Sequence, residues 1–155
     1  MRKTSIVLLL LFSSFITLTA YAQKAAYRRG DLFYNSGDYT AAVQVLEDAI
    51  YEYPDDVGLK FLAGKCYLKL KSYQMANKVL ESVSHTKESY NIPDFSWWLA
   101  RSRYLNSDLE GTISALRRFD RNLQQNGEFS KDDFAFMHRQ VKNAKNFIEN
   151  PSAFY

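Results

Sequence analysis

The stretch "GDYTAAVQVLEDAIYEYPDD", residues 37–56, decides the fold, because much of it returns at residues 71–88 as "KSYQMANKVLESVSHTKE". Small and apolar residues recur at an interval of 34 residues, which is the period of a helix–turn–helix unit. The recurring pairs are Gly30 and Gly64, Phe33 and Tyr67, Tyr39 and Tyr73, Ala42 and Ala76, Leu46 and Leu80, and Ala49 and Val83. The interval therefore predicts an all-α fold built from repeated helix pairs.

The chemistry of the repeated positions supports this interpretation. A glycine inside a helix costs about 1 kcal/mol relative to alanine, so Gly30 and Gly64 indicate places where a neighbouring helix passes close to the backbone. Ala42 and Ala76 suit the same close crossing from the second helix of each pair. Pro54 cannot continue a helix and ends the first unit.

These residues resemble the tetratricopeptide repeat (TPR). Repeat one is expected at about residues 24–56 and repeat two at 57–90, and a weaker repeat three at 94–127 has Ala100 36 residues after Gly64. In repeat three, Tyr104 lies one place later than the TPR pattern requires, and Thr112 stands where alanine is usual. The resemblance implies a right-handed α-solenoid of about three helix pairs within one domain, residues 23–150.

A final helix is predicted over residues 131–149, followed by a tail at 151–155. Apolar residues recur along it at helical spacing, so it can cover the end of the last repeat. That stripe consists of Phe134, Met137, Val141, Ala144 and Ile148. Phe136 and Phe147 lie off the stripe, which leaves two interpretations open: they extend the edge of the core, or they contact another molecule.

The first 22 residues have the organisation of a signal peptide. Arg2 and Lys3 precede a long apolar run, and Ala20-Tyr21-Ala22 forms a small-x-small cleavage site before Gln23. We expect export to the periplasm or the outer-membrane periphery; the alternative is an uncleaved membrane anchor. After cleavage, 18 basic residues face 17 acidic ones, so the charge gives no sign of nucleic-acid binding. The mature chain has no second apolar run that could span a membrane.

No sequence motif of catalysis, metal binding or cofactor binding is present, so the sequence predicts a protein that is not an enzyme and has no metal site and no cofactor. His85 and His138 are expected at the surface. Cys66 cannot form an internal disulfide, because it is the only cysteine, and is expected to be a small buried residue. The cluster of Arg117, Arg118 and Arg121 could contact phosphate, but we interpret it as a solvated helix face.

The resemblance also implies a binding surface. In the TPR family, the first helix of each repeat lines a concave groove that holds a peptide or protein partner. The equivalent positions here form an aromatic row flanked mainly by cations, which suits a peptide. The candidate lining residues are Tyr27, Asp31, Tyr34, Phe61, Lys65, Leu68, Lys69, Trp97, Arg101 and Tyr104. The alternative is that some of these rings belong to the core.

A signal peptide followed by three such repeats also resembles the amino-terminal module of Gram-negative envelope proteins that continue into a β-propeller and an OmpA-like domain. The resemblance implies an envelope-associated partner, and leaves open a free-standing adaptor or a shortened relative. We therefore expect a periplasmic adaptor that binds a peptide or envelope protein. The alternative is a structural subunit that forms oligomers through its ends, using Phe136, Phe147 and residues 152–155.

Overall fold

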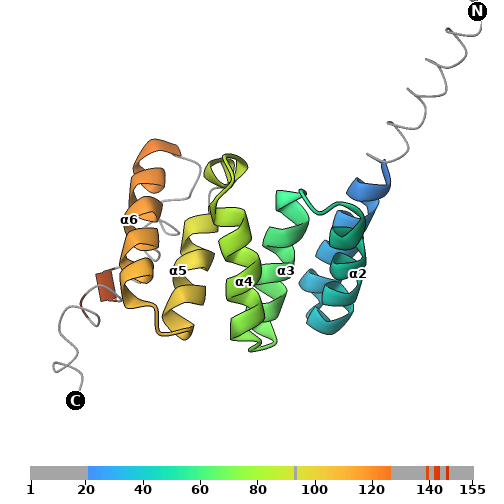
Figure 1. Ribbon diagram of the computed structural model, residues 1–155, viewed down its shortest axis with the longest axis horizontal. Helices are drawn as coiled ribbons and strands as arrows, with labels where there is room; N and C mark the ends of the chain where they lie inside the picture. The colour runs from blue at the N-terminus through green and yellow to red at the C-terminus, as the bar shows by residue number, and fades with distance from the viewer. Residues whose placement is uncertain (1–20, 93, 127–138, 140–141, 144–145, 147–155) are drawn as a thin grey trace, which may run out of the picture. The chain divides into compact units, whose positions relative to one another are not determined.

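The computed structural model describes residues 21–92 and 94–126, together with positions 139, 142, 143 and 146. These residues form helices and turns, and no strand occurs among them (Figure 1). A first helix covers residues 21–36, and the elements after it are α2 (Tyr39–Glu52), α3 (Val57–Lys69), α4 (Tyr73–Ser84), the short 3₁₀ helix η1 (Glu88–Asn91), α5 (Phe95–Leu105) and α6 (Leu109–Asn126). Positions 139, 142, 143 and 146 of the predicted helix 131–149 are helical, and the rest of it, including Phe136 and Phe147, lies outside the described residues.

The chain divides into two compact units, one ending at Leu70 and the other beginning at Lys71. The first unit contains the first helix, α2 and α3, and the second contains α4, η1, α5 and α6. The division falls between the two helices of the predicted second repeat. The organisation of residues 23–150 as one domain remains a prediction.

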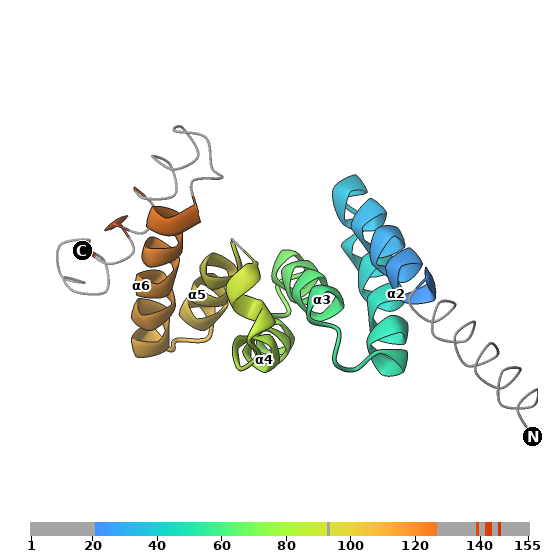
Figure 2. The same ribbon diagram turned by 90° about the horizontal axis from the view of Figure 1, so that it is seen from above.

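In the first unit, the first helix passes very close to α2 at Gly30, and the two helices are seen from above in Figure 2. A Cβ atom added to Gly30 would lie only 2.7 Å from Cδ2 of Leu46. Leu46 and Ala42 are both fully buried on α2. The close crossing expected from the sequence is therefore present, and it explains why a helix interior contains glycine.

The turns that join the helices of each pair share a backbone feature. Gly37, Lys71 and Ser107 all have positive φ angles, of 83°, 60° and 63°. They are separated by 34 and 36 residues, so they occupy the same place in successive repeats. Glycine adopts this left-handed conformation readily, whereas a residue with a Cβ atom is strained there.

The residue after each of these turn positions marks the start of the following helix. Asp38 accepts a hydrogen bond from the backbone N–H of Ala41 at 3.0 Å, and Asp108 accepts one from Gly111 at 2.9 Å. Both carboxylates thereby satisfy backbone donors that the first turn of a helix leaves without partners. Ser72 begins α4 without such a side-chain hydrogen bond.

In the second unit, α4 packs against α5, and α5 packs against α6. The core-facing positions of α6 are Thr112, Leu116 and Phe119, which correspond in the repeat to Ala76, Leu80 and Val83 of α4; all six are buried. Thr112 can replace the usual alanine because its hydroxyl donates a hydrogen bond of 2.6 Å to the Asp108 carbonyl. The weak third repeat thus has the same pattern of buried positions as α4.

None of the helices in the described ranges is long and apolar enough to cross a membrane.

Candidate functional site

In the first unit, the fold brings together three of the predicted lining residues. Tyr34 lies on the first helix, and Phe61 and Lys65 lie one turn apart on α3. The Lys65 Nζ atom is 4.7 Å from the Tyr34 ring centroid and 5.5 Å from the Phe61 ring centroid. These distances are within the range of cation–π attraction, so the ammonium group and both rings form one cluster.

A hollow of about 320 Å³ lies beside Tyr27, with Gln23, Lys24 and Asp56 as its other lining residues. The Tyr27 ring lies over the start of α3, because a Cβ atom added to Gly58 would be 3.5 Å from its Cε2 atom. Gln23 donates a hydrogen bond to the Asp56 carboxylate, which also caps α3 through the Leu59 N–H at 2.8 Å. Tyr27 itself is 39% exposed and can contact a partner.

The remaining candidates of the first unit differ in their exposure. Lys69 is exposed, and Asp31 is partly buried and accepts a hydrogen bond of 3.2 Å from Asn35. Phe61 and Leu68 are only 8% and 6% exposed. Most of the surface of these two side chains therefore packs inside the protein, as the alternative interpretation of the rings requires.

The second unit holds Trp97, Arg101 and Tyr104 on α5. Trp97 is partly buried, and its ring centroid lies 5.7 Å from that of Phe119 on α6. Arg101 is exposed and lies over the Trp98 ring at 5.8 Å, and Tyr104 is 40% exposed. Trp97 thus contributes to packing between α5 and α6, whereas Arg101 and Tyr104 present polar groups to solvent.

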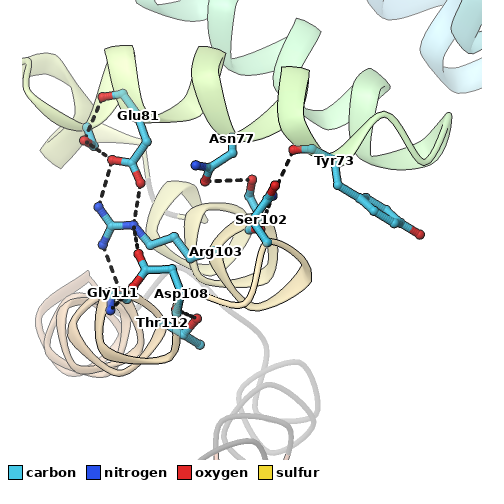
Figure 3. A network of polar contacts seen from close by, with 10 residues as sticks. Tyr73, Asn77, Glu81, Ser102, Arg103, Asp108, Gly111 and Thr112 are labelled. Atoms are coloured by element: carbon cyan, nitrogen blue, oxygen red, sulfur yellow. Dashed lines mark hydrogen bonds and ion pairs between the residues drawn. The ribbon is translucent and has the colours of Figure 1, made fainter.

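A polar contact joins neighbouring helices at one equivalent place in each unit. In the first unit, the Tyr67 hydroxyl on α3 donates to the Glu47 carboxylate on α2. In the second, Arg103 on α5 forms hydrogen bonds of 2.6 and 2.8 Å with the two oxygens of Glu81 on α4 (Figure 3). Glu81 follows Glu47 by 34 residues, and Arg103 follows Tyr67 by 36. Arg103 therefore occupies the aromatic position of the third repeat.

Arg103 also reaches α6. Its Nη1 atom donates a hydrogen bond of 2.9 Å to the Gly111 carbonyl, and its Nε atom lies 3.9 Å from the Asp108 carboxylate. The hydrogen bonds from Arg103 hold the pKa of Glu81 below its usual value, and those to Glu81 raise the pKa of Arg103. This single side chain thus connects α4, α5 and α6.

The contribution of Arg103 was missed in the sequence analysis, which looked for a tyrosine and found Tyr104 one place too late. The signal was available: the 36-residue interval that relates Gly64 to Ala100 also relates Tyr67 to Arg103. Both polar contacts stabilise helix packing. They are structural features and not ligand-binding groups.

Cys66 is fully buried, as expected, and burial raises the pKa of its thiol to about 11. The thiol is therefore protonated and unreactive near neutral pH. Among the described residues, no three His, Cys, Asp or Glu side chains are grouped as metal ligands would be. His85 is exposed, and His138 lies outside the described residues.

Comparison with known proteins gives one match to a protein-family model and several matches to solved structures. Residues 9–83 match the family described as ANAPC3, "Anaphase-promoting complex, cyclosome, subunit 3". A search of curated protein sequences gave no significant match.

Among solved structures, the crystal structure of the Sgt2 TPR domain from Aspergillus fumigatus is similar, with a TM-score of 0.68 and 16% identity, covering 85% of this chain and 82% of that one. MamA (residues 41 to the end) from Desulfovibrio magneticus RS-1 gives 0.59 at 22% identity, covering 83% and 74%. A MamA RS-1 ArsTM double mutant gives 0.59 at 23% identity, covering 84% and 71%. The predicted fold class is thereby confirmed: the chain is an all-α protein with TPR-like repeats.

Proposed function

We propose that this chain is an exported, non-enzymatic adaptor that binds a peptide or an envelope protein through the first helices of its repeats. The supporting observation is the cluster of Lys65 with Tyr34 and Phe61, which joins an ammonium group to two aromatic rings from different helices. TPR-like folds are suited to protein–protein interaction, since each helix pair presents a regular surface while its neighbours supply the core.

In each unit, the chemistry of the proposed contact residues favours an acidic peptide segment. Lys65, Lys69 and Arg101 are cations among the proposed contact residues, and Tyr27 and Tyr104 offer rings with polar tips that are partly exposed. Rings of this kind supply contact area at low entropic cost, and cations raise the rate and specificity of association with a carboxylate-bearing segment.

Crosslinking in the native envelope tests the proposed partner surface. A photoreactive residue in place of Tyr27 or Tyr104 should capture a distinct partner, whereas the same residue in place of Tyr51 should not. Tyr51 is a suitable control because it is 85% exposed but lies on α2, the second helix of a pair. Capture only from position 51 would contradict the proposal.

The captured partner then allows a quantitative test. Truncating a central contact residue often costs about 2 kcal/mol or more of binding free energy, so Tyr27→Ala and Arg101→Ala should weaken binding by about thirtyfold or more. High salt should weaken it further, because exposed charges are screened. Equal affinity of wild type and both variants would move the interaction to another surface.

Export is a separate part of the proposal. The purified mature chain should begin at Gln23 and fractionate with the periplasm or the outer membrane. An intact Met1 in a membrane fraction would instead support the anchor. The alternative function, assembly through the ends of the chain, predicts that crosslinks join two copies and that sedimentation velocity gives a mass that rises with concentration.

A further inference from the structure

Arg118 on α6 is enclosed by aromatic rings. Its Cζ atom lies 3.8 Å from the centroid of the Tyr90 ring on η1 and 5.5 Å from that of Phe95 on α5. Arg117 and Arg121 are exposed, as a solvated helix face requires, but Arg118 is partly buried. The interpretation of these three arginines as one solvated face is therefore wrong for Arg118.

The connection between α4 and α5 forms the other side of this site. The Nη2 atom of Arg118 donates a hydrogen bond of 2.8 Å to Oγ of Ser89, which is fully buried. The Ser89 hydroxyl in turn donates to the Thr86 carbonyl at 2.8 Å, which fixes the orientation of its lone pairs. We call Ser89, Tyr90 and Phe95 the Arg118 cradle. The connection that carries η1 is the one that lengthens the repeat interval from 34 to 36 residues.

The positive charge of Arg118 has no counterion among the residues that the structure describes. Within this part of the chain, its Nε atom is also buried without a hydrogen-bond partner. Burial lowers the pKa of Arg118, as do the nearby charges of Arg103 and Arg121. A guanidinium nevertheless remains charged in proteins, and the buried Nε–H of Arg118 carries a desolvation cost because it has no hydrogen-bond partner. An anion that reached this group would remove that cost.

A carboxylate fits the site better than a phosphate chain does. The planar guanidinium matches the two oxygens of a carboxylate, and stacking on Tyr90 holds its plane in a fixed orientation. Tyr90 is 59% exposed and Arg118 is partly exposed, so the contact between the two side chains lies at the surface. The mature chain is almost neutral, so it offers no extended positive field for a polyanion such as a phosphate chain.

We propose that the Arg118 cradle is a binding site for a carboxylate of an acidic protein segment. The site lies within the second unit and does not include the candidate lining residues named above. Its assignment to a protein partner rests on the proposed adaptor function, whereas carboxylate recognition by Arg118 does not.

The test uses the mature chain, labelled with ¹⁵N, and follows the Nε–H resonances of its arginines. A capped Gly-Glu-Glu-Gly peptide should shift the Arg118 resonance in a saturable manner, while the matched Gly-Gln-Gln-Gly peptide should not. Arg28, which is exposed and belongs neither to the cradle nor to the candidate lining residues, should change only linearly with peptide. Inorganic phosphate at the same ionic strength is the third probe. A tighter response to phosphate than to the glutamate peptide would overturn the carboxylate assignment.

Three variants define the site. Arg118→Lys keeps the charge but loses the planar group and should abolish the saturable response, which backbone resonances of α6 then report. Tyr90→Leu removes the exposed ring and should weaken binding by about two- to fivefold, the range of an exposed cation–π contact. Arg121→Lys, the matched control, should retain the affinity of wild type. Unchanged binding in Arg118→Lys would contradict the proposal.

Two further outcomes are decisive. If Asp120→Asn, Asp132→Asn or Asp133→Asn shifts the Arg118 resonance in the free protein, the counterion comes from this chain and the ligand proposal fails. If the glutamate peptide binds Arg118 but Tyr27 and Tyr104 capture no partner, the adaptor proposal fails and carboxylate recognition remains. The two proposals can therefore fail separately.

Discussion

Arg103 and Glu81 form a bidentate ion pair: the Nε and Nη2 atoms of the guanidinium lie 2.6 and 2.8 Å from the two carboxylate oxygens. The contact joins α5 to α4. It occupies the repeat positions that correspond to Tyr67 and Glu47, which join α3 to α2 in the first unit. The side chains are 17% and 27% exposed, so water screens them only in part. The third repeat has thus replaced an aromatic contact with a charged one.

Breaking this contact should destabilise the second unit. Arg103→Leu and Glu81→Gln should each lower the free energy of unfolding by about 1–3 kcal/mol, as expected for hydrogen bonds to charged groups that are partly buried. Tyr67→Phe, the matched change in the first unit, should cost about 1 kcal/mol, because it leaves the exposed Glu47 solvated. Urea unfolding measures all three. A larger loss in Tyr67→Phe than in Arg103→Leu would contradict this ranking.

The same contact predicts a pH dependence of stability. Because the folded-state pKa of Glu81 lies below its ordinary value of 4.5, the unfolded chain takes up the proton at the higher pH. The stabilisation is therefore complete above the ordinary value and is lost as the pH falls through the lower folded-state pKa. Glu81→Gln should lack this component, so its stability curve should approach that of wild type in acid.

The crossing of the first helix over α2 predicts a non-additive pair of substitutions. Gly30→Ala should destabilise by about 1–3 kcal/mol, because the new methyl group overlaps Leu46, and part of this loss is offset by about 1 kcal/mol of helix propensity. Leu46→Ala should cost about 2–5 kcal/mol by leaving a cavity. In the double variant the added methyl occupies part of that cavity, so the loss should be smaller than the sum. Strict additivity in thermal melts would mean that the two residues do not touch.

Exposure separates the candidate binding residues into two groups with different stability effects. Phe61→Ala should cost about 3–5 kcal/mol, because the ring is buried. Lys69→Ala and Arg101→Ala should change stability by no more than about 0.5 kcal/mol, since both side chains are exposed. Circular dichroism melts decide between these outcomes. If Phe61→Ala melts like wild type, that ring is not part of the core.

The buried thiol predicts slow chemical modification. With its pKa raised to about 11, Cys66 has roughly a hundredfold smaller thiolate fraction at pH 8 than a cysteine with the ordinary pKa of 9.0. Iodoacetamide should therefore label the folded chain at least about a hundred times more slowly than the chain in guanidinium, and mass spectrometry measures both rates. Equal rates would show that α3 opens readily around this residue.

The repeat interval was sufficient to predict the fold class and most of the buried positions. Gly30, Ala42 and Leu46 could be assigned because each is constrained by close helix packing, and that constraint leaves a recognisable residue type at a fixed spacing. The role of Arg103 was not predicted, because a charged side chain at a position that is usually aromatic can be explained only when its partner, Glu81, is known. Arg118 was misassigned for a similar reason: Tyr90 and Ser89 lie on a connection without periodicity, so no spacing relates them to α6.

The left-handed turn residues predict a route to higher stability. Lys71→Gly and Ser107→Gly should each stabilise by about 0.5–1 kcal/mol, because glycine removes the strain of a Cβ atom at positive φ but costs some entropy in the unfolded chain. Lys78→Gly makes the same exchange at an exposed site inside α4 and should destabilise by about 1 kcal/mol. Destabilisation at position 71 would mean that the lysine side chain makes a compensating contact.

The positions that carry backbone strain are different residues from those proposed to meet a partner. Glycine occupies this turn position only in the first repeat, and lysine and serine occupy it in the other two. Lys71→Gly and Ser107→Gly therefore provide a more stable background. In that background, chains with destabilising substitutions such as Arg118→Lys or Phe61→Ala should stay folded, so that their binding can be measured. The effect of a substitution on folding and its effect on partner binding could then be measured separately.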